Sequence, residues 1–386
     1  MMHVVVLGTG MIGTTVVKEL VKSKIIDKVT AVDGVQANLD KCLETVNDVK
    51  ANGKIASFDN KEAIVDVLQE ADIAIACLPH SLSVLANKAA ISAGCHLIDL
   101  VGSKFSEKVQ LSEEAVNQNV LVVPGCGVAP GIVNFLAARG IELLDEADEV
   151  VMLCGGIPYN PLPPLWYQIV FRLESVMGLY TRPALAAENG ELVQLPALSG
   201  KELIQFPDPV GECEAVITDA HSTAYTLKDK VKKLYEKTIR YKGHWEKMSV
   251  LAELGFLDEE PINVGGVEVS PKKVSEVILE PQLKGDTEED ITVLRVTAEG
   301  LKDGKRKKLE WEMIDVYDKE RRITSMAKTT AFPAVIMAEW IAEGKINKLG
   351  IVPPEELIVG ELFEPFINEL KSRGISISFK EDVVSN

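Results

Sequence analysis

The stretch VVVLGTGMIG, residues 4–13, decides the fold of this chain. Its apolar start predicts a buried strand, and Gly8, Gly10 and Gly13 follow with the spacing GxGxxG. Gly8 permits a tight turn, Gly10 lets the backbone approach a pyrophosphate, and Gly13 lets the next helix pack closely on the strand. Free amide groups at the start of that helix attract an anion. The alternative is that the glycines serve packing alone.

An acidic residue, Asp33, stands about 20 residues beyond the last of these glycines, as a dinucleotide-binding fold requires. It ends a second apolar run and is expected to bind the adenosine ribose. A carboxylate repels a 2′-phosphate and no arginine follows it, so we expect NAD rather than NADP. Another acidic residue, Asp59, either caps the next helix or contacts the adenine. The predicted cofactor contacts are Gly8, Thr9, Gly10, Met11, Ile12, Gly13, Asp33, Asp59, Leu78 and Pro79.

Short apolar runs recur through the first part of the chain with helical segments between them. They alternate little between apolar and polar residues, so both faces of each strand should be buried. This pattern predicts a doubly wound parallel sheet of the Rossmann type, because helices must connect the strands. The six predicted strands lie at residues 4–7, 29–32, 55–58, 73–77, 96–100 and 120–123.

The middle of the chain has a different pattern and predicts a second, α+β domain with a mostly antiparallel sheet. The last two of its strand-like runs flank a polar turn containing Asp303 and Gly304, which is typical of a hairpin. We predict that residues 1–126 form the NAD-binding domain, completed by helices from about 329–386. Residues 127–328 are predicted to bind substrate, carry the catalytic groups and form the dimer contact. The strand-like runs lie at residues 149–156, 213–218, 291–298 and 308–317.

The composition excludes several classes of partner. Of 386 residues, 41 are Lys or Arg and 58 are Asp or Glu, which gives a net charge of −17. Such a surface repels nucleic acid and anionic lipid, so we expect a small-molecule substrate instead. No apolar run reaches the roughly 20 residues that cross a membrane. The six cysteines form no CxxC pair or metal-like cluster, so we expect a cytoplasmic protein with reduced thiols and no metal.

Ionisable residues follow the predicted parallel strands, at the edge where such sheets bind ligands. His80 either contacts substrate and acts as a general base, or caps the helix that follows it. Asp99 either binds a substrate ammonium or accepts a hydrogen bond from a nearby backbone amide. Cys126, between two glycines, is more typical of a tight turn than of a nucleophile.

The segment KTIRYKGHWEKM, residues 237–248, concentrates basic and aromatic residues in the second domain. Arg240 suits a bidentate grip on a carboxylate, with a surface ion pair as the alternative. Arg172 and Arg182 are weaker candidates for the same task. Asp219 and His221 either belong to the site or are polar groups in a turn.

Four motifs together resemble the saccharopine dehydrogenase-like family, and within it they are most similar to the L-lysine 6-dehydrogenases. The similarity runs nearly end to end. Saccharopine reductases usually carry an acidic residue where this chain has Ala129, which favours the lysine enzymes. The motifs are GVAPGIVN at residues 127–134, GGIPYNPLPPLWY at 155–167, YTRPA at 180–184 and TIRYKGHWEK at 238–247.

The resemblance implies NAD-dependent oxidation of L-lysine at its ε-amine, which yields NADH, ammonia and a semialdehyde or its cyclic imine. It implies that His244 is a base or water activator and that Arg240 binds the α-carboxylate. The expected catalytic residues are His244, Asp99 and Tyr167, and the expected substrate contacts are Arg240, Trp166, His80 and Asp219.

Two other functions remain open, and family likeness suggests a homodimer or larger oligomer. A relative that oxidises saccharopine or another carboxyalkyl amine would need a second cation, which Arg172 or Arg182 could supply. The other alternative is a non-catalytic protein that binds NAD through the glycine turn but does not oxidise a substrate.

Overall fold

The computed structural model describes residues 1–169, 173–285 and 287–384, so Arg172 lies outside the described residues. The chain forms two compact units, each built from several stretches of sequence. The predicted boundary after residue 126 falls within the first unit, which continues to Glu142. The first unit comprises Met1–Glu142, His221–Thr226 and Ala327–Ile375, and the second comprises Leu143–Ala220, Leu227–Met326 and Ser376–Asn386.

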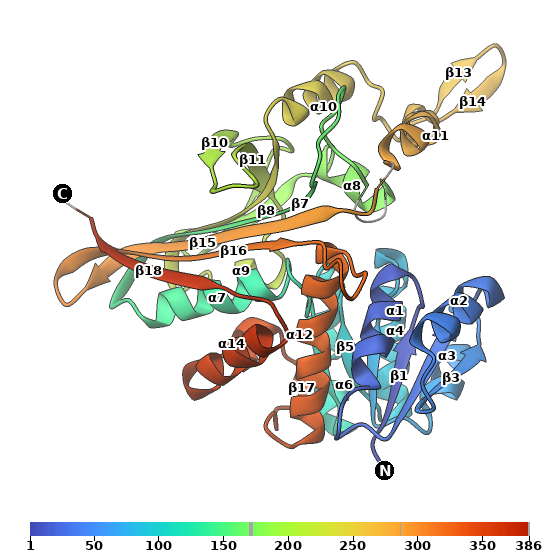
Figure 1. Ribbon diagram of the computed structural model, residues 1–386. Helices are drawn as coiled ribbons and strands as arrows, with labels where there is room; N and C mark the ends of the chain where they lie inside the picture. The colour runs from blue at the N-terminus through green and yellow to red at the C-terminus, as the bar shows by residue number, and fades with distance from the viewer. Residues whose placement is uncertain (170–172, 286, 385–386) are drawn as a thin grey trace. The chain divides into compact units, whose positions relative to one another are not determined.

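The first unit contains a seven-stranded parallel sheet in the order β17-β6-β5-β4-β1-β2-β3. Its central strands are buried on both faces, which confirms the predicted doubly wound α/β class. The strands appear in blue and cyan in Figure 1, with β17 in red. They are β1 (His3–Leu7), β2 (Lys28–Asp33), β3 (Ala51–Ile55), β4 (Ile73–Ala76), β5 (His96–Asp99), β6 (Leu121–Pro124) and β17 (Gly350–Ile351).

Two strands of this sheet differ from the sequence-based expectation. The third strand occupies Ala51–Ile55 rather than residues 55–58, and most of its residues are exposed. Among the described strands it pairs with β2 alone and lies at the edge of the sheet, so backbone hydrogen bonds define it rather than an apolar pattern. The two-residue strand β17 was not predicted, because so short a segment leaves no periodic signal.

Helices cover this sheet and bury small and branched apolar residues against it. The first helix, for example, buries Val16, Val17 and Leu20. The helix α12 begins at Ser325, shortly before the first unit resumes at Ala327. The helices are α1 (Met11–Leu20), α2 (Gln36–Val46), α3 (Lys61–Leu68), α4 (Ser83–Ala93), α5 (Phe105–Lys108), α6 (Ser112–Asn117), α7 (Ile132–Glu142), α9 (His221–Thr226), α12 (Ser325–Ala342), α13 (Pro354–Leu357) and α14 (Phe363–Ser372); short 3-10 turns are η1 (His80–Leu82), η2 (Val109–Leu111) and η3 (Gly360–Leu362).

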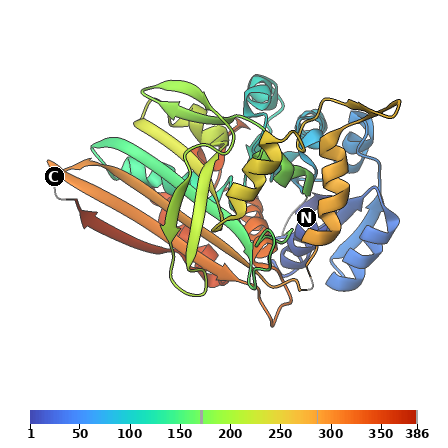
Figure 2. The ribbon, with the colours of Figure 1, turned by 90° about the horizontal axis from the view of Figure 1, so that it is seen from above.

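The second unit contains a nine-stranded, mostly antiparallel sheet, as predicted. Its main path is β10-β11-β12-β7-β15-β16-β18; β8 pairs with β12, and β9 pairs with β8. Among the described strand pairs of this sheet, β12–β7 is the parallel one. The predicted hairpin is β15–β16, whose strands lie side by side in Figure 2. The strands are β7 (Glu146–Pro158), β8 (Ala184–Glu188), β9 (Glu191–Leu195), β10 (Glu202–Gln205), β11 (Glu212–Thr218), β12 (Val231–Tyr241), β15 (Asp290–Lys302), β16 (Lys305–Val316) and β18 (Ser378–Val383).

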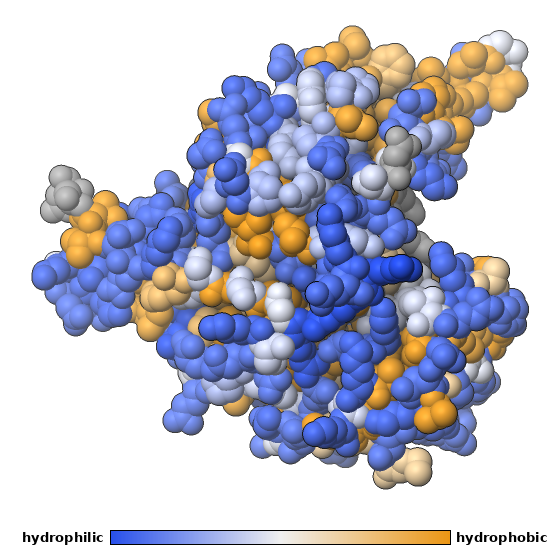
Figure 3. Space-filling view, viewed as in Figure 1, coloured by the Kyte–Doolittle hydropathy of each residue, from blue (hydrophilic) through white to orange (hydrophobic). Residues whose placement is uncertain are grey.

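Three helices and a small hairpin complete the second unit. The helices are α8 (Leu173–Leu179), α10 (His244–Glu253) and α11 (Pro271–Leu283), and the hairpin is β13 (Ile262–Val264) with β14 (Val267–Val269). Val264 and Val267 of the hairpin and Val277 of α11 are exposed. Figure 3 shows orange surface over the hairpin and mixed orange and blue surface over α11. None of the helices described in the chain has the length and apolar character needed to cross a membrane.

Candidate functional site

The glycine turn between β1 and α1 is shaped by contacts that leave no room for side chains at two of its positions. A Cβ on Gly8 would lie 2.6 Å from the Cys77 carbonyl oxygen, and one on Gly13 would lie 1.9 Å from the Gly8 carbonyl oxygen. Gly8 also has a φ of +90°. A Cβ on Gly10, by contrast, would meet nothing within 4 Å. The protein's own packing therefore explains Gly8 and Gly13 but not Gly10.

The start of α1 offers the backbone amides that an anion would need. Its cap residue is Gly10, no side chain caps the helix, and the first turn carries no acidic residue. Beside it, the Leu78 side chain packs close to Gly8, and Leu78 is buried. Met11 and Ile12 lie at the exposed side of the turn, whereas Thr9 is buried. These residues fit a bound diphosphate, with Gly10 as the point of closest approach.

Asp33 is a buried carboxylate at the end of β2. Its Oδ2 accepts hydrogen bonds from the Thr9 amide at 2.7 Å and the Thr9 hydroxyl at 2.9 Å, and its Oδ1 accepts from the Val35 amide at 2.9 Å. Burial raises the pKa of Asp33, but these hydrogen bonds outweigh burial and lower the pKa overall. A fixed negative charge therefore stands next to the glycine turn.

The structure decides between the two roles considered for Asp59 only in part. The cap of α3 is Asn60, whose Oδ1 accepts from the Ala63 amide at 2.9 Å, so Asp59 is not the helix cap. Asp59 is exposed and accepts a hydrogen bond from the Ser57 hydroxyl. Its contact with adenine stays a prediction.

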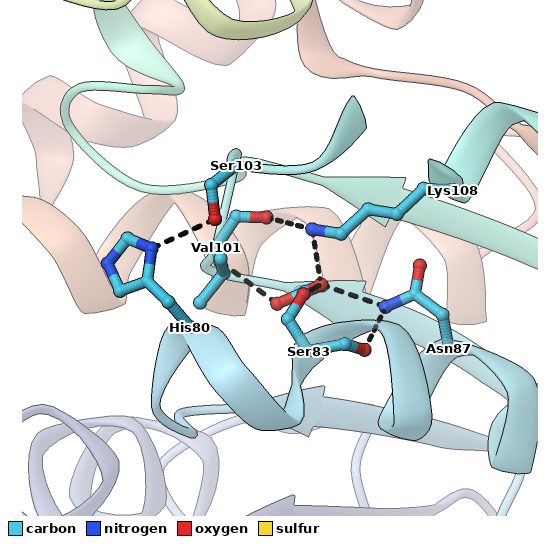
Figure 4. Close-up of polar contacts among 7 residues, drawn as sticks. His80, Ser83, Asn87, Val101, Ser103 and Lys108 are labelled. Atoms are coloured by element: carbon cyan, nitrogen blue, oxygen red, sulfur yellow. Dashed lines mark hydrogen bonds and ion pairs between the residues drawn. The ribbon is translucent and has the colours of Figure 1, made fainter. Parts of the chain in front are cut away.

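Asp99 lies at the end of β5 and is 1% exposed. Lys108 Nζ lies 2.9 Å from Asp99 Oδ2, which also accepts from Ser83 Oγ and Asn87 Nδ2; these three partners are labelled in Figure 4. Oδ1 accepts from the Val101 amide at 2.9 Å. The ammonium that faces Asp99 is thus the protein's own Lys108, itself fully buried. This geometry favours a structural role for Asp99 over the predicted contact with a substrate ammonium.

His80 and Ser103 face each other at the same edge of the sheet (Figure 4). His80 begins the turn η1 after β4, and its Nδ1 lies 2.9 Å from Ser103 Oγ in the loop after β5. Both side chains are half-buried. Nearby Cys126 is buried, and burial raises the pKa of its thiol, so it fits the turn role rather than that of a nucleophile.

Arg240 occupies an aromatic box in the second unit. Its guanidinium carbon lies 4.5 Å from the ring centre of Tyr167 and 5.7 Å from that of Trp245. Arg240 is 5% exposed, and it donates from Nη1 to the Ile239 carbonyl at 2.7 Å. Its Nε has no hydrogen-bond partner, and no carboxylate pairs with it among the described residues. A buried guanidinium without an acid is the arrangement expected of an anion site.

His244 packs beside this box and has protein partners at both ring nitrogens. Nδ1 lies 2.9 Å from the Leu165 carbonyl, so it carries the hydrogen, and Nε2 accepts from the Tyr180 hydroxyl at 3.0 Å. Burial, together with the charge of Arg240, lowers the pKa of His244 to about 3. The side chain is 0% exposed, so this geometry favours a positioning role over the predicted role as a base.

The remaining predicted residues of this unit differ in their exposure and contacts. Tyr167 is buried and stacks on it, whereas Trp166 is half-buried and stacks on the Lys247 ammonium at 3.8 Å. Asp219 directly follows β11 and is half-buried, and Arg182 is exposed. Sequence reasoning missed Tyr180 as a partner of His244, although it lies in one of the quoted motifs. No group of three or more potential metal ligands occurs in the part of the chain that the structure describes.

Comparison with known proteins gives matches that cover most of the chain. Residues 4–123 match the model of the saccharopine dehydrogenase NADP binding domain, and residues 127–375 match that of the saccharopine dehydrogenase C-terminal domain. The saccharopine dehydrogenase (NADP(+), L-glutamate-forming) of Schizosaccharomyces pombe is 24% identical, over 90% of this chain and 92% of its own length.

Two further comparisons concern length and fold. The mitochondrial alpha-aminoadipic semialdehyde synthase of Bos taurus is 22% identical over 96% of this chain, which spans only 47% of that relative. Among solved structures, the apo histidine-tagged saccharopine dehydrogenase (L-Glu forming) from Saccharomyces cerevisiae matches with a TM-score of 0.80 at 19% identity, covering 100% of both chains. That likeness shows a shared fold.

Proposed function

The chain belongs to the saccharopine dehydrogenase family, and on this premise we propose that it is a pyridine-nucleotide-dependent oxidoreductase acting on an amine of an amino acid. The observation that carries the proposal is the space beside Gly10 in the glycine turn. A Cβ at this position would meet no protein atom within 4 Å, so the protein's own packing does not explain the glycine. The bound nucleotide would accept a hydride from the carbon that bears the amine.

The cofactor that we propose is NAD. The Asp33 carboxylate, held by Thr9 and Val35, would accept hydrogen bonds from the adenosine ribose hydroxyls. The same charge would repel a 2′-phosphate, and the hydrogen bonds that lower its pKa keep it ionised at neutral pH. The matching family model and the Schizosaccharomyces pombe relative name NADP, so the Asp33 argument is specific to this chain.

The substrate that we propose is L-lysine, oxidised at its ε-amine. Arg240 would bind the α-carboxylate, since its guanidinium is buried against aromatic rings without an acid of its own. Tyr167 and Trp245 would hold the guanidinium plane, and the Tyr180–His244 hydrogen bond would fix the wall behind it. Asp99 and Lys108 would stabilise the cofactor-binding unit rather than contact substrate.

Saccharopine is the second candidate substrate, favoured by the relatives that carry its name. It has more than one carboxylate at a distance from the reacting amine, so it would require a second cation. Arg182 is exposed and has no contact with the Arg240 box among the described contacts, which makes L-lysine the better fit.

A panel assay tests both choices. The protein is mixed with NAD or NADP and with L-lysine or saccharopine, and absorbance of the reduced cofactor is followed. We expect reduction of NAD with L-lysine; the variant D33S should lose preference for NAD while retaining turnover. Turnover with saccharopine alone would show that saccharopine, and not L-lysine, is the substrate. Nucleotide binding without any turnover would reject the enzyme proposal.

A further inference from the structure

Four loops meet at the carboxyl edge of the parallel sheet, and they contain few groups that can exchange a proton near neutral pH. The loops follow β1, β4, β5 and β6 and comprise residues 8–10, 77–82, 100–104 and 125–131. Their ionisable residues are Cys77, His80, Lys104 and Cys126. Burial raises the pKa of both thiols, and the Lys104 side chain is exposed. Of these four, the imidazole is the group suited to proton transfer. A second imidazole, His221 at the start of α9, packs against the loop of Ser103, since a Cβ on Gly102 would lie 3.3 Å from its Cγ.

His80 is held in a defined orientation by Ser103. When the imidazole Nδ1–H donates to Ser103 Oγ across their 2.9 Å separation, the lone pair belongs to Nε2. The same hydrogen bond persists when Nε2 takes up a proton, because Oγ remains an acceptor for Nδ1–H. Ser103 therefore supports both protonation states of His80 without moving.

One buried carboxylate fixes the loops that carry both residues. Asp99 Oδ2 accepts from Ser83 Oγ at 2.6 Å, which anchors the start of α4 directly after the turn of His80. Asp99 Oδ1 accepts from the Val101 amide at 2.9 Å, which anchors the loop that ends in Ser103 (Figure 4). Lys108 bridges the Asp99 carboxylate and the Val101 carbonyl. Hydrogen bonds to one buried carboxylate thus hold the two segments that carry His80 and Ser103.

The position of this pair relative to the glycine turn is also defined. β4 is the neighbour of β1 in the sheet, with Ala76 opposite Leu7, and the Cys77 amide donates to the Leu7 carbonyl at 2.8 Å. In sheets of this kind the ligand lies beyond the carboxyl ends of the strands, across the point where strand order reverses. Here that point separates β1 from β4, so the loop of His80 lies on the opposite side from Asp33, which would bind the adenosine.

We propose that His80, oriented by Ser103, is the base that removes a proton from the substrate ammonium. The inference rests on the proposed function. An N–H bond of the ammonium breaks and its proton passes to Nε2 of His80, which leaves an electron pair on the nitrogen. That pair forms the C=N bond while the adjacent carbon gives its hydride to NAD⁺, the oxidant. The resulting iminium then takes up water.

The test compares H80Q, H80A and S103A with the wild type. The control is S81A, which alters the exposed serine next to His80. Steady-state rates with L-lysine and NAD are measured across pH, and saccharopine serves as the second probe. We expect H80Q to lower kcat by about 100-fold or more and to remove the acid limb of the kcat/KM profile. S103A should shift that limb and reduce kcat about tenfold, while S81A should match the wild type. Added imidazole should partly restore activity to H80A.

The outcomes separate this inference from the proposed function. If the wild type turns over and H80Q keeps its pH profile and kcat, His80 is not the base, although the enzyme proposal stands. If the wild type binds NAD but reduces it with neither probe, both proposals are wrong. Should H80Q fail to fold, the pH profile of S103A and the imidazole response of H80A decide the question, and no response in either rejects the role.

Discussion

Two arginines of the second unit, the buried Arg240 and the half-buried Arg295, have different partners. Arg240 and Arg295 both stack on aromatic rings, but Arg295 is paired with Glu312. Arg240 has no acid among the described residues, so its burial costs stability, and under the proposed function this unpaired charge would bind the substrate carboxylate.

The variant R240M should raise KM for the amino acid by about 10- to 150-fold, because one charge-assisted pair of about 1.5–3 kcal/mol is lost. Its melting temperature should be unchanged or higher, since an unpaired buried charge is removed. R295M is the control: it should lower the melting temperature and leave KM unchanged. A fall in the stability of R240M with an unaltered KM would contradict the carboxylate role.

The burial of His244 leads us to expect that the free energy of unfolding depends on pH. Its pKa in the folded chain is lowered to about 3, mainly by burial, whereas an unfolded histidine titrates near about 6.5. The unfolded chain therefore binds this proton first, and the stability that neutral His244 supplies is lost as pH falls below about 6.5 toward the folded pKa. The slope is up to about 1.4 kcal/mol per pH unit.

Urea denaturation of the wild type and H244N at several pH values between about 6.5 and 4.5 measures this slope. H244N cannot titrate, so its stability should fall less steeply over this range than that of the wild type. Parallel curves for the two proteins would show that His244 is not held neutral by burial.

Single residues were predictable from sequence where a motif demands them. The glycines and Asp33 carry a defined spacing that only a strand, a turn and a helix together explain. The Lys108–Asp99 pair was not predictable, because lysine is ordinarily exposed and nothing in the local sequence marks this one as buried. The same holds for the Tyr180–His244 contact, which joins residues 64 positions apart.

The turn between β1 and α1 predicts different effects for two glycines. Alanine at Gly13 would place its Cβ 1.9 Å from the Gly8 carbonyl oxygen, so G13A should shift the backbone and cost about 1–3 kcal/mol or more. G10A meets no atom and should fold like the wild type, yet it should weaken NAD binding. Calorimetry of both variants with and without NAD measures this, and wild-type affinity in G10A would place the diphosphate elsewhere.

The loop after β5 depends on the buried pair of Lys108 and Asp99. Removing the lysine leaves an uncompensated buried carboxylate, so K108M should destabilise the protein by about 3–5 kcal/mol. K104M alters an exposed lysine of the same segment and should change stability by less than about 0.5 kcal/mol. Equal stabilities of the two variants in denaturant would show that the pair contributes nothing.

Elements were predictable in proportion to their apolar pattern. The strands β1, β4 and β5 are continuous buried runs, and sequence located them within a residue or two. The strand β12 was not predicted, since its lysines and glutamate interrupt the apolar residues. It is a strand because β11 and β7 pair with it on both sides, which is tertiary information.

At the scale of the whole molecule, each unit is assembled from separated stretches of chain. Phe135 of α7 packs against Phe363 and Phe366, and Phe105 packs against Tyr225, so distant segments supply part of the first unit's core. Sequence patterns predicted the return of later helices but not the short insertion His221–Thr226, which is too brief to show periodicity.

A fragment of residues 1–142 should therefore not fold on its own. It would lack β17 and the aromatic partners of Phe135 and Phe105, so apolar surface would be exposed. Near-ultraviolet circular dichroism and binding of a hydrophobic dye should show a loosely packed state. A fragment that also carries residues 221–226 and 327–375 through flexible linkers should show a cooperative transition. A cooperative transition in residues 1–142 alone would contradict this.

The interrupted first unit has a consequence for how the protein is made. Its last described segment, Ala327–Ile375, is translated long after its first strand, so the dinucleotide-binding half cannot close while the second half is still being synthesised. Many multidomain proteins complete their leading domain at the ribosome before the next one emerges. Here the parallel sheet of the nascent chain lacks its last strand and its C-terminal helices until late in synthesis. The N-terminal part of the first unit is therefore the part most exposed to aggregation during translation.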